Sequence, residues 1–289
     1  MTDEFSRFHP LVNVIFYITV LGITMFQMQA GLTIISLLCS IIYHIYLKRR
    51  NSIKFCMMAL FIFVCSAVIN PLFSHKGATL LFYLFTGNPV TLESIVYGIF
   101  AAMAITAVLF WLSTFNVIMS EDKILALVGK LMPRVALLLT MIFRFVGRYT
   151  RKSRDIAMTQ QALYGKPDSL IQKVKSGAKN FSITATWALE NSVDTADSMT
   201  ARGYGAAKRT SYNHYKIEKR DMAVIIWMIL LFTIVNTGLV LEKIYTYYYP
   251  LIRIKGNIGV YITYTLLCMT PLAINLLEEL RWHRLKSKI

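Results

Sequence analysis

Two trios of charged residues have a spacing that could do chemistry. Within each trio the residues recur after three or four positions, so the trio would line one face of a helix. The acidic trio is Glu190, Asp194 and Asp197, and the basic trio is Arg144, Arg148 and Arg151. Three carboxylates could bind a divalent cation or carry protons, but no histidine accompanies them, and a hard cation needs more converging oxygens than one helix face offers. We therefore favour ion pairs between the two stripes, or two faces in water.

A second candidate is the stretch "SMTARGYG", Ser198 to Gly205, at the end of a long helical pattern. Gly203 or Gly205 can take the left-handed conformation that ends a helix, which would leave Arg202 at a projecting tip. An arginine with small neighbours can donate two hydrogen bonds to a carboxylate or to helix-end carbonyls of a close partner. The plainer alternative is an ordinary helix end whose basic residue is favoured by the helix dipole.

Catalytic patterns are missing from the sequence. There is no GxxxxGK[ST], HExxH or GxSxG motif, and the five histidines are scattered. The cysteines form no CxxC pair and fall in or beside apolar runs, which favours small buried side chains over metal ligands; they are Cys39, Cys56, Cys65 and Cys268. We therefore expect no catalytic residues, no metal site and no cofactor in this chain.

The composition indicates a membrane protein. Apolar residues make up 56% of the 289 positions, charged residues only 16%, and the mean hydropathy is +0.52. A spanning helix needs about 20 apolar residues, and six runs qualify: 11–29, 30–47, 55–71, 92–112, 222–241 and 257–279. Ionisable residues inside these runs stand only near the ends (Glu93, Glu278 and Glu279), which argues against a proton-coupled carrier acting alone.

The basic residues set the expected orientation. Twenty-seven of the 31 fall on one side of a six-span arrangement, and basic loops stay cytoplasmic, so both termini are expected in the cytoplasm. The net charge of +16 then reflects topology and contact with anionic lipid headgroups, and we expect no nucleic-acid partner.

The predicted organisation has three parts. Residues 1–112 carry four spans, 113–220 form a cytoplasmic helical segment, and 221–289 carry two spans and a short basic tail. In the middle part an amphipathic helix over 121–133 precedes two long antiparallel helices, which are separated by a break at 164–169. The fold expected is thus an all-α integral membrane protein, with about six transmembrane helices and a cytoplasmic platform of about three amphipathic coupling helices.

Three features together resemble a known family. They are the outer-loop stretch "NPLFSHKGATLLFYLFTGNPVTLES" (Asn70 to Ser94), the long basic helical segment, and the terminal "MTARGYG" (Met199 to Gly205). In combination they resemble the transmembrane T component of energy-coupling factor transporters, over about residues 55 to 280. The resemblance implies a prokaryotic cell-membrane subunit that is not itself an enzyme.

The resemblance also implies partners and docking residues. Such a subunit couples two ABC-type ATPases, which bind the ATP and Mg²⁺, to a small membrane S component that chooses the vitamin or metal ion. Ala201, Arg202 and Gly203 match the second of two ATPase-docking motifs. The first should lie in Ala162, Leu163, Tyr164 and Gly165, where the arginine is absent; either Lys166 or Arg154 substitutes for it, or the two docking sites differ in strength. The alternative functions are a stand-alone secondary transporter and a membrane enzyme.

Overall fold

The computed structural model describes residues 3–48, 52–74, 77–83, 89–206, 215–241, 244–249 and 251–286. Parts of the outer-loop stretch Asn70 to Ser94, namely 75–76 and 84–88, lie outside the described residues. The chain divides into two compact units. Unit 1 contains Met1–Lys123 and Tyr215–Ile289, and unit 2 contains Ile124–His214.

Of the residues that the structure describes, 81% are helical, which is consistent with an all-α membrane protein. Unit 1 contains the short 3-10 helix η1 (Phe5–Arg7) and the helices α1 (Pro10–Phe26), α2 (Ala30–Lys48), α3 (Ser52–Phe73), α4 (Leu92–Ile118), α8 (Lys219–Val240) and α9 (Ile258–Lys286). The helix α5 (Glu121–Leu131) begins in unit 1 and continues into unit 2, which also holds α6 (Pro133–Tyr164) and α7 (Leu170–Ala201).

Five of the described helices are long and apolar enough to cross a membrane: α2, α3, α4, α8 and α9. The first expected span, 11–29, instead ends at Phe26, and its helix α1 has 17 residues. Gln29 lies beyond the end of this helix. Its side-chain amide donates to the carbonyl of Ile244 (3.3 Å) and its side-chain oxygen accepts from the hydroxyl of Thr246 (3.0 Å).

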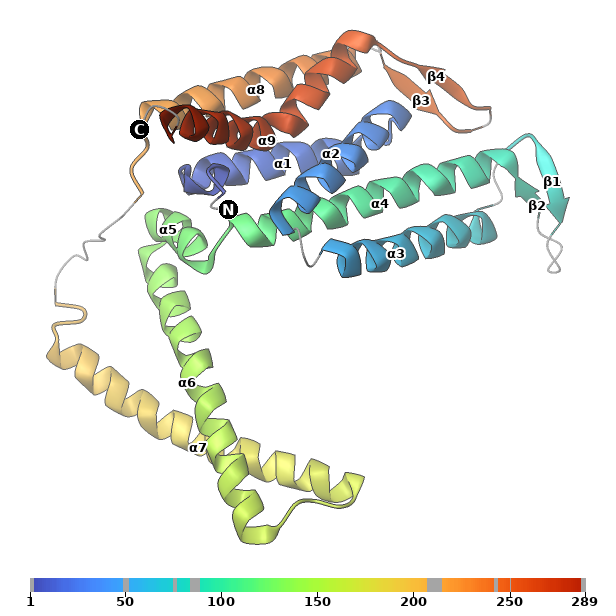
Figure 1. Ribbon diagram of the computed structural model, residues 1–289. Coiled ribbons are helices and arrows are strands. Elements are labelled where there is room, and N and C mark those ends of the chain that lie inside the picture. Colours follow the sequence, from blue (N-terminus) through green and yellow to red (C-terminus); the bar gives the residue numbers. More distant parts are fainter. Residues whose placement is uncertain are drawn as a thin grey trace. The chain divides into compact units, whose positions relative to one another are not determined.

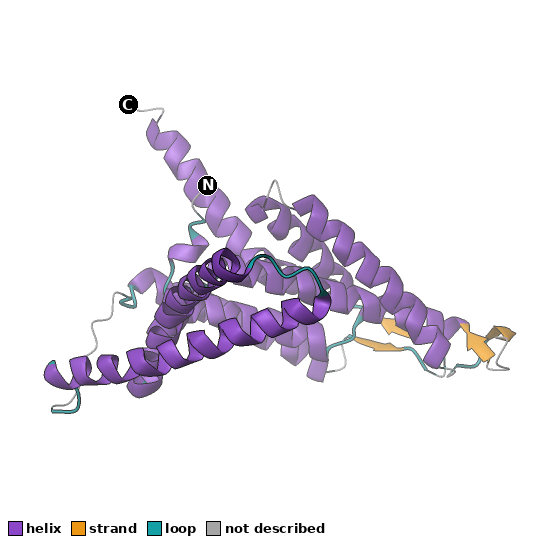
Figure 2. Cartoon of the chain, turned by 90° about the horizontal axis from the view of Figure 1, so that it is seen from below, coloured by secondary structure: helices purple, strands orange, loops and turns teal. Residues whose placement is uncertain are grey.

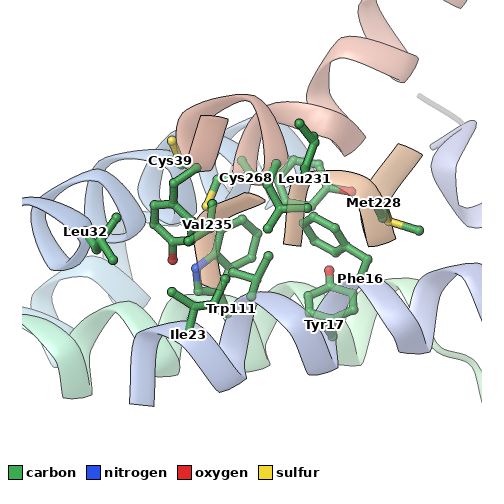
Figure 3. Packing of buried hydrophobic residues seen from close by; sticks show 14 of the residues in the cluster. Phe16, Tyr17, Ile23, Leu32, Cys39, Trp111, Met228, Leu231, Val235 and Cys268 are labelled. Carbon is green, nitrogen blue, oxygen red and sulfur yellow. The ribbon is translucent and has the colours of Figure 1, made fainter. Parts of the chain in front are cut away.

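The helices of unit 1 pack side by side around an aromatic core (Figure 1). Trp111 of α4 is fully buried; its ring meets Phe16 and Tyr17 edge-on, and its indole N–H donates to the hydroxyl of Ser36 (3.0 Å). Figure 3 shows α1, α2, α4, α8 and α9 all contributing side chains to this cluster. A membrane helix bundle needs such internal partners for its polar atoms, because lipid supplies none.

Two short antiparallel hairpins lie at the same end of the unit 1 helices (Figure 2). Strands β1 (Leu80–Tyr83) and β2 (Pro89–Thr91) form one, and β3 (Tyr245–Tyr247) and β4 (Arg253–Lys255) form the other. The first hairpin is fixed by Glu93, whose buried carboxylate accepts from the backbone N–H and the hydroxyl of Thr79. The second is fixed by Tyr248, whose hydroxyl donates to the carbonyl of Met28 (3.1 Å).

The long helices of unit 2 begin and end at sequence-encoded signals. Proline starts α6 at Pro133, and Gly165 ends it with a φ of 78°. The hydroxyl of Ser169 caps α7 by accepting from the N–H of Gln172 (3.2 Å). Within unit 2, α6 and α7 cross each other (Figure 1), and neither helix contains a buried residue.

Candidate partner-docking site

The end of α7 forms a well-defined tip around Arg202. The N–H of Tyr204 donates to the carbonyl of Met199 (3.0 Å), and the N–H of Gly203 donates to the carbonyl of Thr200 (2.9 Å). With Gly203 at a φ of 82°, this is a Schellman motif, in which the left-handed residue directly follows the helix cap. Arg202 occupies the cap position itself, and its side chain is exposed.

Glycine is required at Gly203 by its backbone conformation, since a φ of 82° disfavours residues with a side chain. Crowding is not the reason, because a Cβ built on Gly203 would meet nothing within 4 Å. Ala201 on its other side is small and exposed. Among the described residues no ion pair involves Arg202. All five hydrogen-bond donors of the guanidinium can therefore be offered to a partner at a point where the backbone is uncovered.

The end of α6 carries the second candidate tip, Ala162 to Gly165. Leu163 and Tyr164 are 71% and 74% exposed. The Lys179 ammonium of α7 lies 4.3 Å from the centroid of the Tyr164 ring, so a cation–π contact holds that ring from the neighbouring helix. The structure therefore presents an apolar and aromatic tip here, just before the start of α7, whereas the charged tip at Arg202 lies at the opposite end of that helix.

The two cations considered as substitutes for the missing arginine lie at different distances along the chain. Arg154 stands nine residues before Leu163 on the same helix, which is about 13 Å at the rise of an α-helix. Lys166 directly follows Gly165 and is exposed. Of these two cations, Lys166 is thus the one next to this tip.

The two charged stripes form no ion pairs with each other among the described residues, although such pairs were one of the two arrangements expected from the sequence. Among the described residues no ion pair joins Arg144, Arg148 or Arg151 to the acidic trio, so the expected ion pairs between the stripes are wrong. Arg148 instead lies over the ring of Trp187, with 5.6 Å to the centroid. The six charged residues are exposed, as two solvated faces require. No group of three His, Cys, Asp or Glu side chains in the described parts of the chain could hold a metal ion.

The contacts of Trp187 were not predicted from the sequence. It is half-buried where α7 crosses α6, with the ring of Tyr149 edge-on at 5.6 Å and the Lys152 ammonium 5.3 Å from its centroid. Phe145 in turn stacks on Tyr149. A single tryptophan in an otherwise polar amphipathic helix was the signal available, since such a side chain usually marks a packing contact.

Both long helices expose apolar side chains over much of their length. Exposed fractions above 70% occur at several of them, against a background of lysines and arginines; these are Leu163, Leu170, Ile171, Val174, Phe181 and Leu189. Apolar surface on this scale marks a binding site for a protein or a membrane surface. Unit 2 therefore has two projecting tips and uncovered apolar faces.

No family model matches this chain, and no curated protein matches it either.

Proposed function

We propose that this chain is the transmembrane coupling subunit of an ATP-driven importer of the energy-coupling factor type. The observation that carries the proposal is the Arg202 tip. Arg202 is the C-cap residue of a 32-residue helix that has no buried residue, and its guanidinium is exposed. Its support is the combination of that tip with a bundle of membrane-length helices and with the residue pattern that resembles the T component. On this proposal the chain is not an enzyme, and ATP and Mg²⁺ are bound by two partner ATPases.

In this account α1 acts as the sixth span. Its 17 residues fall at the lower end of the length range for transmembrane helices. Six spans place both termini on the same side, and the distribution of Lys and Arg makes that side the cytoplasm. The protein then sits in a prokaryotic cell membrane, with unit 2 as its cytoplasmic platform.

The two tips would each enter a groove on one ATPase. Arg202 would donate paired hydrogen bonds to a carboxylate or to helix-end carbonyls, while Ala201 and Gly203 let the partner's backbone approach. The tip at Leu163 and Tyr164 would bind through apolar contacts, with Lys166 beside it. The two docking sites would therefore differ in chemistry, and the Arg202 site would be the more sensitive to charge.

Motion of the ATPases would reach the membrane through α6 and α7. Each has 32 residues, which is about 48 Å of helix, and the contacts of Trp187 hold their crossing. Movement of a tip would therefore shift the whole helix. The exposed apolar faces of the same helices would contact the S component, whose reorientation releases its vitamin or metal ion inward.

Neither Glu93 nor the acidic trio of α7 supports the alternative functions. A secondary transporter would need an ionisable group available within the membrane, yet the buried carboxylate of Glu93 is occupied by Thr79 at the end of the bundle that carries the hairpins. A membrane enzyme would need converging acids or histidines. The acidic trio on α7 stays on one exposed helix face.

Co-purification with candidate ATPases tests the proposal. The chain is co-expressed with an ATPase pair, purified through its own tag and compared with Arg202→Glu and with the control Lys175→Glu, an exposed lysine elsewhere on α7. Reversing the charge of an interface hot spot should weaken binding by about 100-fold or more. We expect Arg202→Glu to lose the ATPases and the control to keep them. Equal retention by both variants, with transport intact, would refute the docking role.

A further inference from the structure

The N-terminal segment Asp3–His9 contacts both stretches of chain that connect unit 1 with unit 2. The exit stretch is Ile118–Lys123, where the chain leaves unit 1, and the return stretch is Tyr215–Asp221, where it re-enters. Both stretches belong to unit 1, so their contacts with the segment are internal to it. None of these residues has a role in the docking tips.

Lys123 fastens the exit stretch. Its ammonium donates to the carbonyl of Ser6 (2.5 Å), the hydroxyl of Ser6 (2.7 Å) and the carbonyl of Ile118 (2.7 Å), which uses all three of its donors. The residue is only 6% exposed, although it lies in the first turn of an amphipathic helix. Burial lowers the pKa of the Lys123 ammonium, while the nearby Asp3 carboxylate opposes that change. Replacing such a buried, fully bonded lysine alone is costly in stability, because its acceptors are left buried without a donor.

Asp221 fastens the return stretch. Its carboxylate accepts from the N–H of His9 (3.4 Å) through one oxygen and from the N–H of Glu218 (2.9 Å) through the other. The second bond belongs to the capping box that begins α8. The guanidinium of Arg220 also lies over the ring of Phe8, 5.2 Å from its centroid. The same short segment therefore holds the start of α8.

The segment itself is anchored in the core of unit 1. Phe5 is fully buried and meets Phe16 of α1 edge-on, with 5.5 Å between ring centroids. The N–H of Phe5 donates to the side-chain oxygen of Asn275 in α9 (3.0 Å), whose amide in turn donates to Asp3. The segment is thus a fixed part of the helix bundle that reaches both connections.

We propose that residues Asp3–His9 form a clasp that ties the exit and return stretches together, with Lys123 as the positioning residue. The clasp makes the two chain connections of unit 2 a single attachment to the membrane helices. On the proposed function, on which this second step rests, movement of α6 and α7 then acts on the bundle through one fixed point. Without the clasp the exit and return stretches would move independently of each other, and less of the movement of α6 and α7 would reach the membrane helices.

Amide hydrogen exchange on the full chain in detergent tests the clasp without any partner. Lys123→Met removes all three bonds; the matched control is Lys216→Met, an exposed lysine in the return stretch. We expect Lys123→Met to speed exchange about tenfold or more at residues 215–222, although the three bonds of its ammonium go to Ser6 and Ile118, as well as at 118–124. The control should leave both unchanged. Acceleration confined to 118–124 would overturn the clasp, because Lys123 would then be a local contact only.

Two further variants keep the test usable if Lys123→Met does not fold. Ser6→Ala removes one acceptor and leaves the backbone carbonyl, so it should produce the same pattern at smaller amplitude. Asp221→Ala works from the other side and should speed exchange at 118–124. A change limited to 215–222 in the Asp221 variant would again overturn the clasp.

Transport measurements separate the clasp from the proposed function. In vesicles containing the chain, the ATPases and an S component, Lys123→Met should retain the ATPases but lower substrate uptake per ATP hydrolysed by about tenfold. An unchanged ratio would overturn the role of the clasp in coupling. If the wild-type chain binds no ATPase, the proposed function fails, whereas the exchange pattern still decides whether the clasp exists.

Discussion

Unit 1 and unit 2 differ in how far their side chains are buried and bonded within the unit. In unit 1 several large aromatic residues are buried, and two of them have bonded polar atoms: the indole of Trp111 donates to Ser36, and the hydroxyl of Tyr17 donates to Thr114. In unit 2 neither α6 nor α7 buries any residue, and the helices touch through a few aromatic and cationic side chains. Unit 1 is therefore stable through its own contacts, while unit 2 presents surface for others to cover.

The largest expected effect is the truncation of the unit 1 core. Trp111→Ala removes a buried ring from contact with Phe16 and Tyr17 and leaves the Ser36 hydroxyl with one bond fewer. We expect a loss of about 3 to 5 kcal/mol in the free energy of unfolding, measured by thermal or denaturant unfolding in detergent. A loss below about 1 kcal/mol would contradict the assignment of this ring to the core.

The next largest effect is expected from a pair of glycine substitutions, which should lower stability in unit 1 but not in unit 2. Gly77 has a φ of 140°, and an added Cβ would lie 2.5 Å from a carboxylate oxygen of Glu93. Gly77→Ala should therefore cost about 1 to 3 kcal/mol and loosen the β1–β2 hairpin. Gly147→Ala in α6 meets nothing within 4 Å and should be neutral or stabilising by up to about 1 kcal/mol. Equal effects at the two positions would remove the contrast between the units.

The smallest effect on stability is expected at Trp187. Trp187→Leu should leave the unfolding transition of unit 1 unchanged, because the contacts of the ring with Tyr149, Arg148 and Lys152 all lie within unit 2. It should instead broaden the distribution of distances between spin labels placed on α6 and α7. A distribution as narrow as that of the wild type would show that other contacts hold the crossing.

Hydropathy and helix-end signals predicted much of this fold. The long apolar runs appear as the helices α2, α3, α4, α8 and α9, and the break at 164–169 lies between α6 and α7. The two hairpins were not predicted, because their strands are only three or four residues long and the second is fixed by the contact of Tyr248 with Met28, which is 220 residues away in the chain. Local sequence carries no signal for such contacts.

The candidate site was predicted in part for the same reason. The glycine at the end of α7 follows from local backbone preferences, so the form of the Arg202 tip could be read from "ARGYG". The partners of the charged residues could not. Arg148 lies over Trp187 and Lys123 bonds to Ser6, and both contacts depend on how elements far apart in the chain pack together.

The docking of an ATPase at Arg202 is the central claim, and a charge exchange across that contact tests it most directly. Arg202→Glu is combined with carboxylate-to-lysine changes along the ATPase groove, and the affinity of the ATPase pair for the purified chain is measured for each combination. We predict that Arg202→Glu lowers the affinity for the ATPase pair by about 100-fold, and that one groove variant raises the affinity of the Arg202→Glu chain again by at least about tenfold. Wild-type affinity for Arg202→Glu alone would contradict it.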